Sequence, residues 1–276
     1  MRYGIKTSPQ ETTYDAMKAV WQAADELPIF ESAWTFDHFY PIFSDPLGPC
    51  MEGWITLSAL AECTSRIRVG CLVTGMVYRH PAVLANMAAT LDIVSEGRLE
   101  LGVGAGWNEE ELSAYGIELG SLTERFDRLD EGLTVIDSLL RNEWTDFEGK
   151  HFTITRGRCE PKGPQRPRVP ITIGGAGRKR TLKAAARFAD HWNHPGGTPE
   201  AIGEAKAVLH AHCADIGRDP SEILTSCHVR YDPAAGTQQL VDTCATLEGV
   251  VDMAIVYVPQ PHTAEKVGTI ADALAS

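Results

Sequence analysis

The segment from Ile67 to Trp107 constrains the fold of this chain more than any other. It begins with β-branched residues spaced two apart, which predicts a strand. From His80-Pro81 onward, apolar residues recur every three or four positions, which is typical of one face of a helix. After Gly97 the two-residue period returns over Leu99 to Val103. A strand, a helix and a strand over this length form a βαβ unit with parallel strands, and both faces of such a sheet must be covered.

Strands and helices alternate along the rest of the chain in the same way. Asn142 to Cys159 interrupts the pattern and predicts a hairpin, inserted after the fourth helix. Eight alternating units over residues 1–276 predict a single α/β domain of the (β/α)8 TIM-barrel type, with an open doubly wound sheet as the alternative. The six further predicted strands are Tyr3–Thr7, Ser32–Phe39, Pro170–Gly175, His191–Asn193, Glu222–Tyr231 and Val250–Val258.

The composition of the chain indicates which classes of partner it could bind and in which compartment it is expected. The chain has 25 lysines and arginines against 37 aspartates and glutamates, a net charge of −12, whereas nucleic-acid binding needs a basic face. The N-terminal residues show no apolar run, so we expect no signal peptide, and no apolar stretch reaches the length of a membrane span. Seven cysteines without a CxxC spacing indicate reduced thiols. We therefore expect a cytoplasmic protein that binds neither nucleic acid nor a membrane.

Active sites of TIM barrels lie at the carboxyl ends of the strands, so these ends are where chemistry is expected. Asp37-His38 ends the second predicted strand, and His38 could exchange a proton near neutral pH beside an ionised Asp37. The alternative is a surface pair or a turn made by Asp37. We expect no metal site, because no HxH or HExxH motif accompanies the pair. Thr74 offers a hydroxyl after the third strand.

Glycine-rich segments follow the fourth and fifth barrel strands. In the first, Gly104 and Gly106 would let a ligand approach the backbone, and Trp107 could stack on a flat ring, although close packing in a barrel also explains the glycines. The second segment precedes a helix, whose free N–H groups and positive end suit a phosphate, although basic residues at such a place are often simply solvated. It comprises Gly174, Gly175, Ala176, Gly177, Arg178, Lys179 and Arg180.

Taken together, these segments resemble the luciferase-like monooxygenase superfamily, and within it the oxidoreductases that use the deazaflavin coenzyme F420. The similar stretches keep their order through most of the chain, and the resemblance implies the bacterial-luciferase-like TIM barrel. They are SAWTFDHF (residues 32–39), VGCLVTGMVYRHPAVLANMAATLDIVSEGRLELGVGAGWNEEE (69–111), ERFDRLDEGL (124–133) and ITIGGAGRKRTLKAAARFADHWN (171–193).

The resemblance also implies roles for individual residues. Asp37 and His38 would lie at the deazaflavin ring, and a bulge with a non-prolyl cis peptide at Cys71-Leu72 would back the ring, with Thr74 nearby. The glycines after the fourth strand would hold the ring, and Gly174 with Gly175 would hold the phosphate.

In one respect the sequence departs from the family pattern. Several relatives have a catalytic glutamate where this chain has Trp107, and the glutamates Glu109 to Glu111 follow in a different register. His38 is therefore the main acid–base candidate.

The sequence thus predicts an F420-dependent oxidoreductase, a homodimer that transfers a hydride between the deazaflavin and a small organic substrate. One alternative is an FMN-dependent luciferase-like monooxygenase. Another, of a different class, is a barrel that binds flavin or deazaflavin without catalysis.

Overall fold

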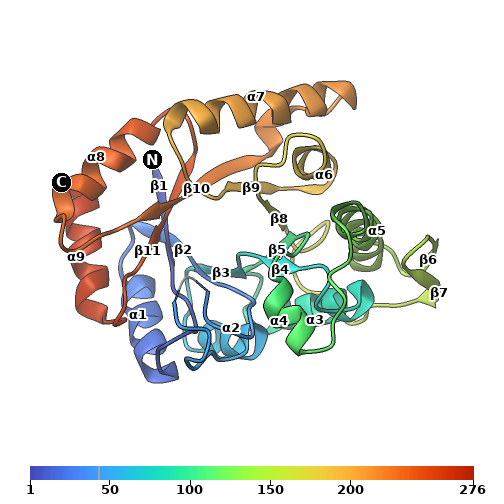
Figure 1. Cartoon of the computed structure of the whole chain (residues 1–276), viewed down its shortest axis with the longest axis horizontal. Coiled ribbons are helices and arrows are strands. Elements are labelled where there is room, and N and C mark those ends of the chain that lie inside the picture. The colour runs from blue at the N-terminus through green and yellow to red at the C-terminus, as the bar shows by residue number, and fades with distance from the viewer. Residues whose placement is uncertain (43) are drawn as a thin grey trace.

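Parallel strands close into a barrel in the computed structural model, which describes residues 1–42 and 44–276. The sheet is closed because β3 pairs with β5 as well as with β2, and helices surround it (Figure 1). The predicted (β/α)8 fold is confirmed. The barrel strands are β1 (Arg2–Lys6), β2 (Phe30–Thr35), β3 (Arg68–Cys71) with its continuation β4 (Thr74–Gly75), β5 (Leu99–Gly104), β8 (Ile171–Gly174), β9 (His191–His194), β10 (Leu224–Arg230) and β11 (Met253–Tyr257).

The outer helices follow the predicted order and bury their apolar faces against the strands. The longest, α5, begins with a capping box in which Ser121 and Glu124 satisfy each other's backbone N–H groups. In the described part of the chain, we find no helix with the length and apolarity needed to cross a bilayer. The helices are α1 (Tyr14–Glu26), α2 (Gly53–Glu62), α3 (Pro81–Val94), α4 (Glu109–Ala114), α5 (Leu122–Arg141), α6 (Thr181–Phe188), α7 (Pro199–Asp215), α8 (Thr237–Leu247) and α9 (Ala264–Ala275), with a 3-10 turn at Pro220–Glu222.

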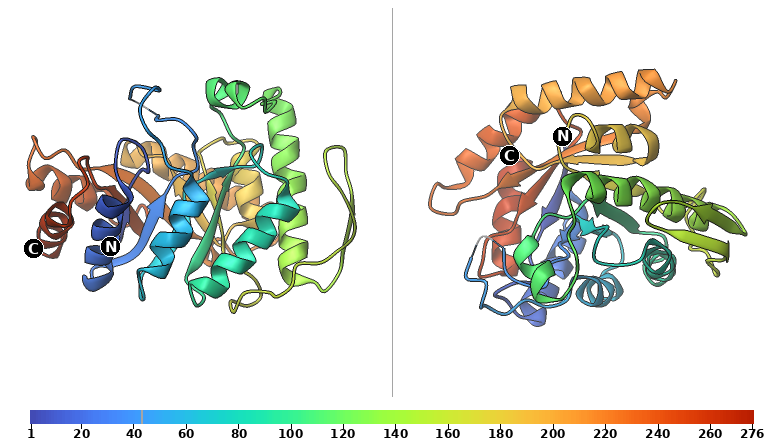
Figure 2. Two further views of the ribbon diagram at one scale, coloured as in Figure 1. Left: turned by 90° about the horizontal axis from the view of Figure 1, so that it is seen from below. Right: turned by 45° about the vertical axis from the view of Figure 1, so that its right-hand side comes forward.

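The predicted hairpin is confirmed. Strands β6 (Thr145–Glu148) and β7 (Thr153–Gly157) pair in antiparallel fashion directly after α5 and project outside the ring of helices (Figure 2). The carboxylate of Glu131 on α5 accepts hydrogen bonds from the backbone N–H groups at 150, 151 and 152. The turn of the hairpin is therefore attached to the helix that precedes it.

Two features near the barrel mouth differ from the sequence prediction: the end of β2 and an additional short helix. Strand β2 ends at Thr35, so Asp37 and His38 lie in the following loop and not on the strand. The short helix α4 was not predicted, because it has one turn and a half and a first turn of three glutamates without an apolar period. Asn108 caps it by accepting a hydrogen bond from the N–H of Glu111.

The non-prolyl cis peptide joins Leu72 and Val73, so the prediction of Cys71-Leu72 is wrong by one residue. The reason lies in the strand pairing. The N–H of Leu72 still donates to the carbonyl of Thr35 on β2, at 2.9 Å, so the regular ladder continues through Leu72. It resumes where Thr74 pairs with Val103 on β5.

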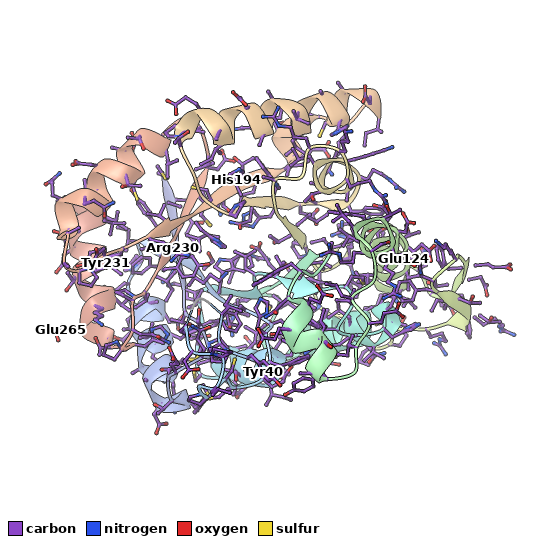
Figure 3. All side chains as sticks on the ribbon, viewed as in Figure 1. Tyr40, Glu124, His194, Arg230, Tyr231 and Glu265 are labelled. Carbon is purple, nitrogen blue, oxygen red and sulfur yellow. The ribbon has the colours of Figure 1, made fainter. Side chains whose placement is uncertain are left out.

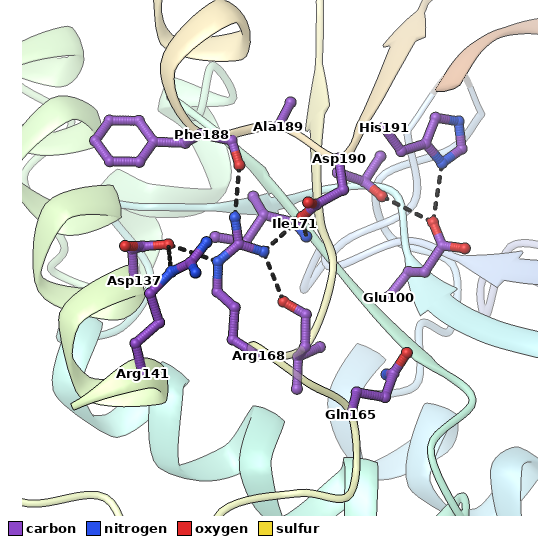
Figure 4. A network of polar contacts seen from close by, with 12 residues as sticks. Glu100, Asp137, Arg141, Gln165, Arg168, Ile171, Phe188, Ala189, Asp190 and His191 are labelled. Atoms are coloured by element: carbon purple, nitrogen blue, oxygen red, sulfur yellow. Dashed lines mark hydrogen bonds and ion pairs between the residues drawn. The ribbon is translucent and has the colours of Figure 1, made fainter. Parts of the chain in front are cut away.

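A buried glutamate holds four barrel strands together from inside. Glu100 on β5 accepts hydrogen bonds from Arg68 Nε at 2.6 Å and Thr172 Oγ1 at 3.1 Å. It also lies 2.9 Å from His191 Nδ1 (Figure 4). His191 Nε2 in turn lies 2.6 Å from Ser226 Oγ. Burial alone would raise the pKa of Glu100, but His191 and Arg68 outweigh it and lower the pKa to about 2.

This network predicts a specific acid sensitivity. Because the pKa of Glu100 is lower in the folded state than in the unfolded chain, the stabilisation is complete above about pH 4.5 and is lost as the pH falls toward 2. We expect Glu100→Gln to lower the free energy of unfolding at neutral pH and to flatten its decline between pH 4.5 and 2. Urea unfolding at several pH values, with Glu143→Gln as an exposed control, would measure this. An unchanged slope in Glu100→Gln would contradict it.

Candidate functional site

A cavity of about 370 Å³ opens at the carboxyl ends of the barrel strands. This is the end of a TIM barrel at which active sites lie. Most of the barrel strands contribute their last residue to its lining. These terminal residues are Lys6 of β1, Gly75 of β4, Gly104 of β5, Gly174 of β8, Arg230 of β10 and Tyr257 of β11.

His38 lies in the lining of this cavity and is held by a buried carboxylate. Its Nδ1 is 3.0 Å from Oε1 and 3.2 Å from Oε2 of Glu111, whose side chain is fully buried. The hydroxyl of Tyr78 donates to the same carboxylate, and the N–H of Phe39 donates to it at 3.1 Å. Sequence reasoning missed Glu111 as a functional residue. The available signal was the spacing of Asn108 and Glu111, which is that of a helix cap.

The surroundings of Glu111 favour its charged form. Burial would raise the pKa of Glu111, but the hydrogen bonds from His38 and Tyr78 outweigh this effect and lower it. Burial and the negative charge of Glu111 together raise the pKa of Tyr78, so its hydroxyl stays a donor. An ionised acceptor at Nδ1 fixes the tautomer of a neutral imidazole, which leaves Nε2 of His38 able to accept a proton.

Asp37 points away from the cavity, unlike its neighbour His38. Its side chain is fully buried and accepts both guanidinium branches of Arg79, with Nη2 at 3.1 Å from Oδ1. Arg79 also binds Glu52, the N-cap of α2. Asp37 thus anchors the loop that carries His38, and the structure does not bring its carboxylate into the cavity lining.

The break between β3 and β4 forms one wall of the cavity. Leu72 and Val73 are part of the lining, and Val73 lies against two strand-end glycines. A Cβ atom at Gly104 would come within 2.7 Å of Val73 Cγ2, and one at Gly174 within 2.8 Å of Val73 Cγ1. The two glycines therefore leave the space that the Val73 side chain occupies.

Two other predicted residues of the third strand lie behind this wall. Cys71 and Thr74 are buried and are not in the cavity lining. The hydroxyl of Thr74 accepts a hydrogen bond from the indole of Trp54 at 2.8 Å, which joins α2 to the strand. The structure therefore gives Thr74 a packing role next to the cavity wall.

Trp107 and the glycine before it form the rim on the side of β5. Gly106 has a φ of +82°, a backbone conformation that favours glycine, and it lines the cavity together with Trp107. The indole is 54% exposed, and its ring centre is 5.4 Å from that of His38. A flat apolar surface therefore lies beside the imidazole at the cavity mouth.

The glycine-rich loop after β8 lies only partly in the cavity. Gly174 and Gly175 line it, and Gly175 has a φ of +117°, with its N–H donating to Asn193 O at 3.0 Å. Gly177 and Arg178 line a second cavity of about 330 Å³, which shares Phe126 with the first. Ala176 lies between Gly175 and Gly177 and lines neither of these cavities.

Two arginines of this loop form ion pairs that the sequence did not predict. Arg178 pairs with Glu204 at 2.6 Å on the surface. Arg180 pairs with two aspartates of α5, Asp127 at 2.8 Å and Asp130 at 2.9 Å. Exposed pairs of this kind are weak, so Arg178 can exchange its partner for a phosphate at small cost. Among the described residues, no group of histidine, cysteine, aspartate and glutamate side chains is arranged to hold a metal ion.

A family model for luciferase-like monooxygenases matches residues 1–268. The chain belongs to this family. Its relatives include an F420-dependent glucose-6-phosphate dehydrogenase of Microbacterium testaceum, 32% identical over 238 residues, which are 84% of this chain and 69% of that protein. A pyrimidine monooxygenase of Caulobacter vibrioides is 31% identical over 174 residues, 61% of this chain and 48% of that protein.

The chain also spans less than two thirds of the length of another relative. The chain spans 63% of the length of an uncharacterized protein of Mycobacterium tuberculosis, to which it is 36% identical over 185 residues, or 66% of this chain. Among solved structures, an F420-dependent secondary alcohol dehydrogenase in complex with an F420–acetone adduct superposes with a TM-score of 0.88. That likeness covers 99% of this chain and 98% of the other at 18% identity, so it concerns the fold.

The geometry around Glu111 predicts the protonation of His38. We expect the neutral imidazole of His38 to carry its proton on Nδ1, because Glu111 accepts there at 3.0 Å. The ¹⁵N chemical shifts of the imidazole, assigned by their loss in His38→Ala, would identify the tautomer. In Glu111→Gln we expect the Nε2–H tautomer to become populated. A predominant Nε2–H tautomer in the unsubstituted protein would refute the prediction.

Proposed function

We propose that the protein is an F420-dependent oxidoreductase that transfers a hydride between the deazaflavin and a small organic substrate. The observation that carries this proposal is His38, held by a buried carboxylate at the edge of a cavity with a glycine-flanked wall. F420-dependent dehydrogenases among the relatives support the choice of cofactor.

The cavity has features that fit a planar cofactor. In this proposal Leu72 and Val73 back the ring, while Gly104 and Gly106 keep side chains out of its plane. The loop from Gly174 to Arg178 would hold the phosphate, through backbone N–H groups near the start of α6. Cys71 and Thr74 would support the wall from behind, and the indole of Trp107 would cover the mouth.

The bound cofactor supplies the hydride chemistry, and the protein supplies position and protons. His38 would exchange a proton with the substrate oxygen through Nε2. Glu111 would hold the imidazole in the required tautomer and stabilise it when it becomes charged. Asp37 would act indirectly, by fixing the loop through Arg79.

An FMN-dependent monooxygenase is the second candidate, because monooxygenases are also among the relatives. A third is a barrel that binds one of these cofactors without turnover. The fold is compatible with all three, since it positions a ring and leaves the reaction to the cofactor.

Titration with both cofactors distinguishes the first two candidates. We expect purified protein to bind F420 tightly and FMN weakly or not at all, followed by cofactor fluorescence. Tight binding of FMN without binding of F420 would overturn the proposal in favour of the monooxygenase. If F420 binds but no hydride transfer is found across alcohols and carbonyl compounds, the non-catalytic barrel becomes the better account.

Replacement of His38 tests the proton transfer. We expect His38→Ala to lower kcat by about 10²–10⁴-fold, the usual effect of losing a general acid–base group, with little change in F420 affinity. His210→Ala, an exposed histidine on α7, is the control. A variant that keeps nearly full turnover would remove His38 from the mechanism, and a parallel loss of F420 affinity would indicate a packing role.

We further propose that the protein is a cytoplasmic homodimer. The outer face of α2 and α3 supports pairing, because Ile55, Val83 and Val94 are 74%, 54% and 42% exposed around a surface groove of about 760 Å³. Apolar patches of this kind often mark protein interfaces. The cysteines are free thiols, which suits a reducing compartment.

A further inference from the structure

The cavity differs in charge from the chain as a whole. Acidic residues outnumber basic ones by 37 to 25 along the sequence. Of the described residues that line the cavity, none is an aspartate or a glutamate, whereas Lys6, Arg230, His38 and His228 all contribute. The lining of this cavity is therefore basic, although the protein as a whole is acidic.

Lys6 is the most constrained of these cations. It is the last residue of β1 and only 4% exposed. Its Nζ donates to the carbonyl of Leu72 at 2.7 Å and lies 5.0 Å from the centre of the Tyr257 ring. Neither partner carries a full charge, and a buried ammonium is costly without a counter-charge. The site is thus suited to an anion that arrives from outside.

Two residues of β10 stand on the same side as Tyr257. His228 and Arg230 are two positions apart on the strand, so their side chains share one face. His228 Nδ1 is 3.4 Å from the Tyr257 hydroxyl, and the Arg230 guanidinium is 5.7 Å from the Tyr257 ring centre. Arg230, the last residue of β10, is labelled in Figure 3. We refer to Lys6, His228 and Arg230 as the basic wall.

The electrostatics of His228 reflect this arrangement. Burial lowers the pKa of His228 well below its ordinary value, and the positive charges of Lys6 and Arg230 lower it further, as do His194 and His191. Its Nε2 is buried without a hydrogen-bond partner among the described residues. Burial and the neighbouring positive charges together therefore favour the neutral form of the His228 ring.

Two residues of the basic wall lie across the barrel from the break between β3 and β4. Around the closed sheet the strands follow the order β1, β2, β3, β5, β8, β9, β10 and β11, which puts β10, with His228 and Arg230, opposite β3. A cofactor ring resting on Leu72 and Val73 would therefore have His228 and Arg230 on its far side, whereas Lys6, which donates to the Leu72 carbonyl, would lie at the edge of the ring. A substrate between the ring and β10 would meet Arg230 and Lys6 with the end that does not react.

We infer that the basic wall is an oxyanion-binding subsite, and that the substrate carries a carboxylate or a phosphate group. This inference rests on the proposed function, because that function assigns the bulge side to the cofactor. Lys6 would bind the oxyanion as a buried point charge, and Arg230 would close over it from the more exposed side.

The subsite can be tested without any cofactor. Inorganic phosphate or acetate is added to the protein at constant ionic strength, and the imidazole signals of His228, assigned with His228→Gln, are followed by NMR. We expect a saturable shift and a rise in the pKa of His228, since a bound anion offsets the positive charges. Tighter binding of phosphate would indicate a phosphate ester as substrate, and tighter binding of acetate an organic acid.

Variants locate the site. We expect Lys6→Met to weaken anion binding by at least about tenfold, the effect of losing a hydrogen bond to a charged group. Arg230→Met is exposed and gives a second test should Lys6→Met fail to fold. Lys150→Met, a distant exposed lysine, should bind as the unsubstituted protein does. No saturable shift, the same shift with chloride alone, or full affinity in both wall variants would overturn the inference.

The F420 titration separates this inference from the proposed function. Loss of F420 binding with retained anion binding would refute the proposed cofactor and leave the subsite in place. Normal F420 binding without anion binding would refute the subsite alone. If Lys6→Met loses affinity for F420 and keeps its affinity for both anions, the basic wall serves the cofactor and the inference is wrong.

Discussion

The contact between His38 and Glu111 is the interaction on which the arrangement of the site depends. It joins a loop after β2 to a short helix after β5, two segments far apart in the sequence. The carboxylate also accepts from Tyr78 and from two backbone N–H groups, at Phe39 and Tyr40. A fully buried carboxylate is stable only with such donors, so the loop and the helix must be in place together.

The neighbouring residue fixes the same loop from its other face. Asp37 is bound by Arg79, which also reaches the helix cap Glu52. Breaking a buried charged pair by removing one partner costs about 3–5 kcal/mol, so this anchor is a substantial part of local stability. Because the chain has left the strand at Thr35, adjacent side chains can diverge, one toward the anchor and one toward the cavity. Sequence adjacency therefore does not imply a shared chemical role.

The sequence predicted the barrel, the hairpin and the location of the site, because apolar periods and strand ends are local features. Long-range contacts were not predictable in this way. Glu111 looked like one of three exposed glutamates, and only the folded chain shows that it is buried against His38. The break in the third strand lies one residue after the predicted position, because the hydrogen bond from Leu72 to β2 keeps the strand regular up to that residue. Arg178 and Arg180 likewise have carboxylate partners from other helices.

The family resemblance implies a glutamate at the position of Trp107, whereas the rim of this cavity carries an indole whose ring centre is 5.4 Å from that of His38. A second carboxylate at the mouth would add negative charge next to a cavity whose far side is basic. With an indole there, the carboxylate of Glu111 lies behind His38 and would balance the charge that the imidazole gains in the proposed proton exchange. Lys6 and Arg230 bring positive charge to the lining as well. The proposed subsite and the proposed role of His38 therefore both favour a bound molecule with negative charge, at the end facing the basic wall and at an oxygen facing His38.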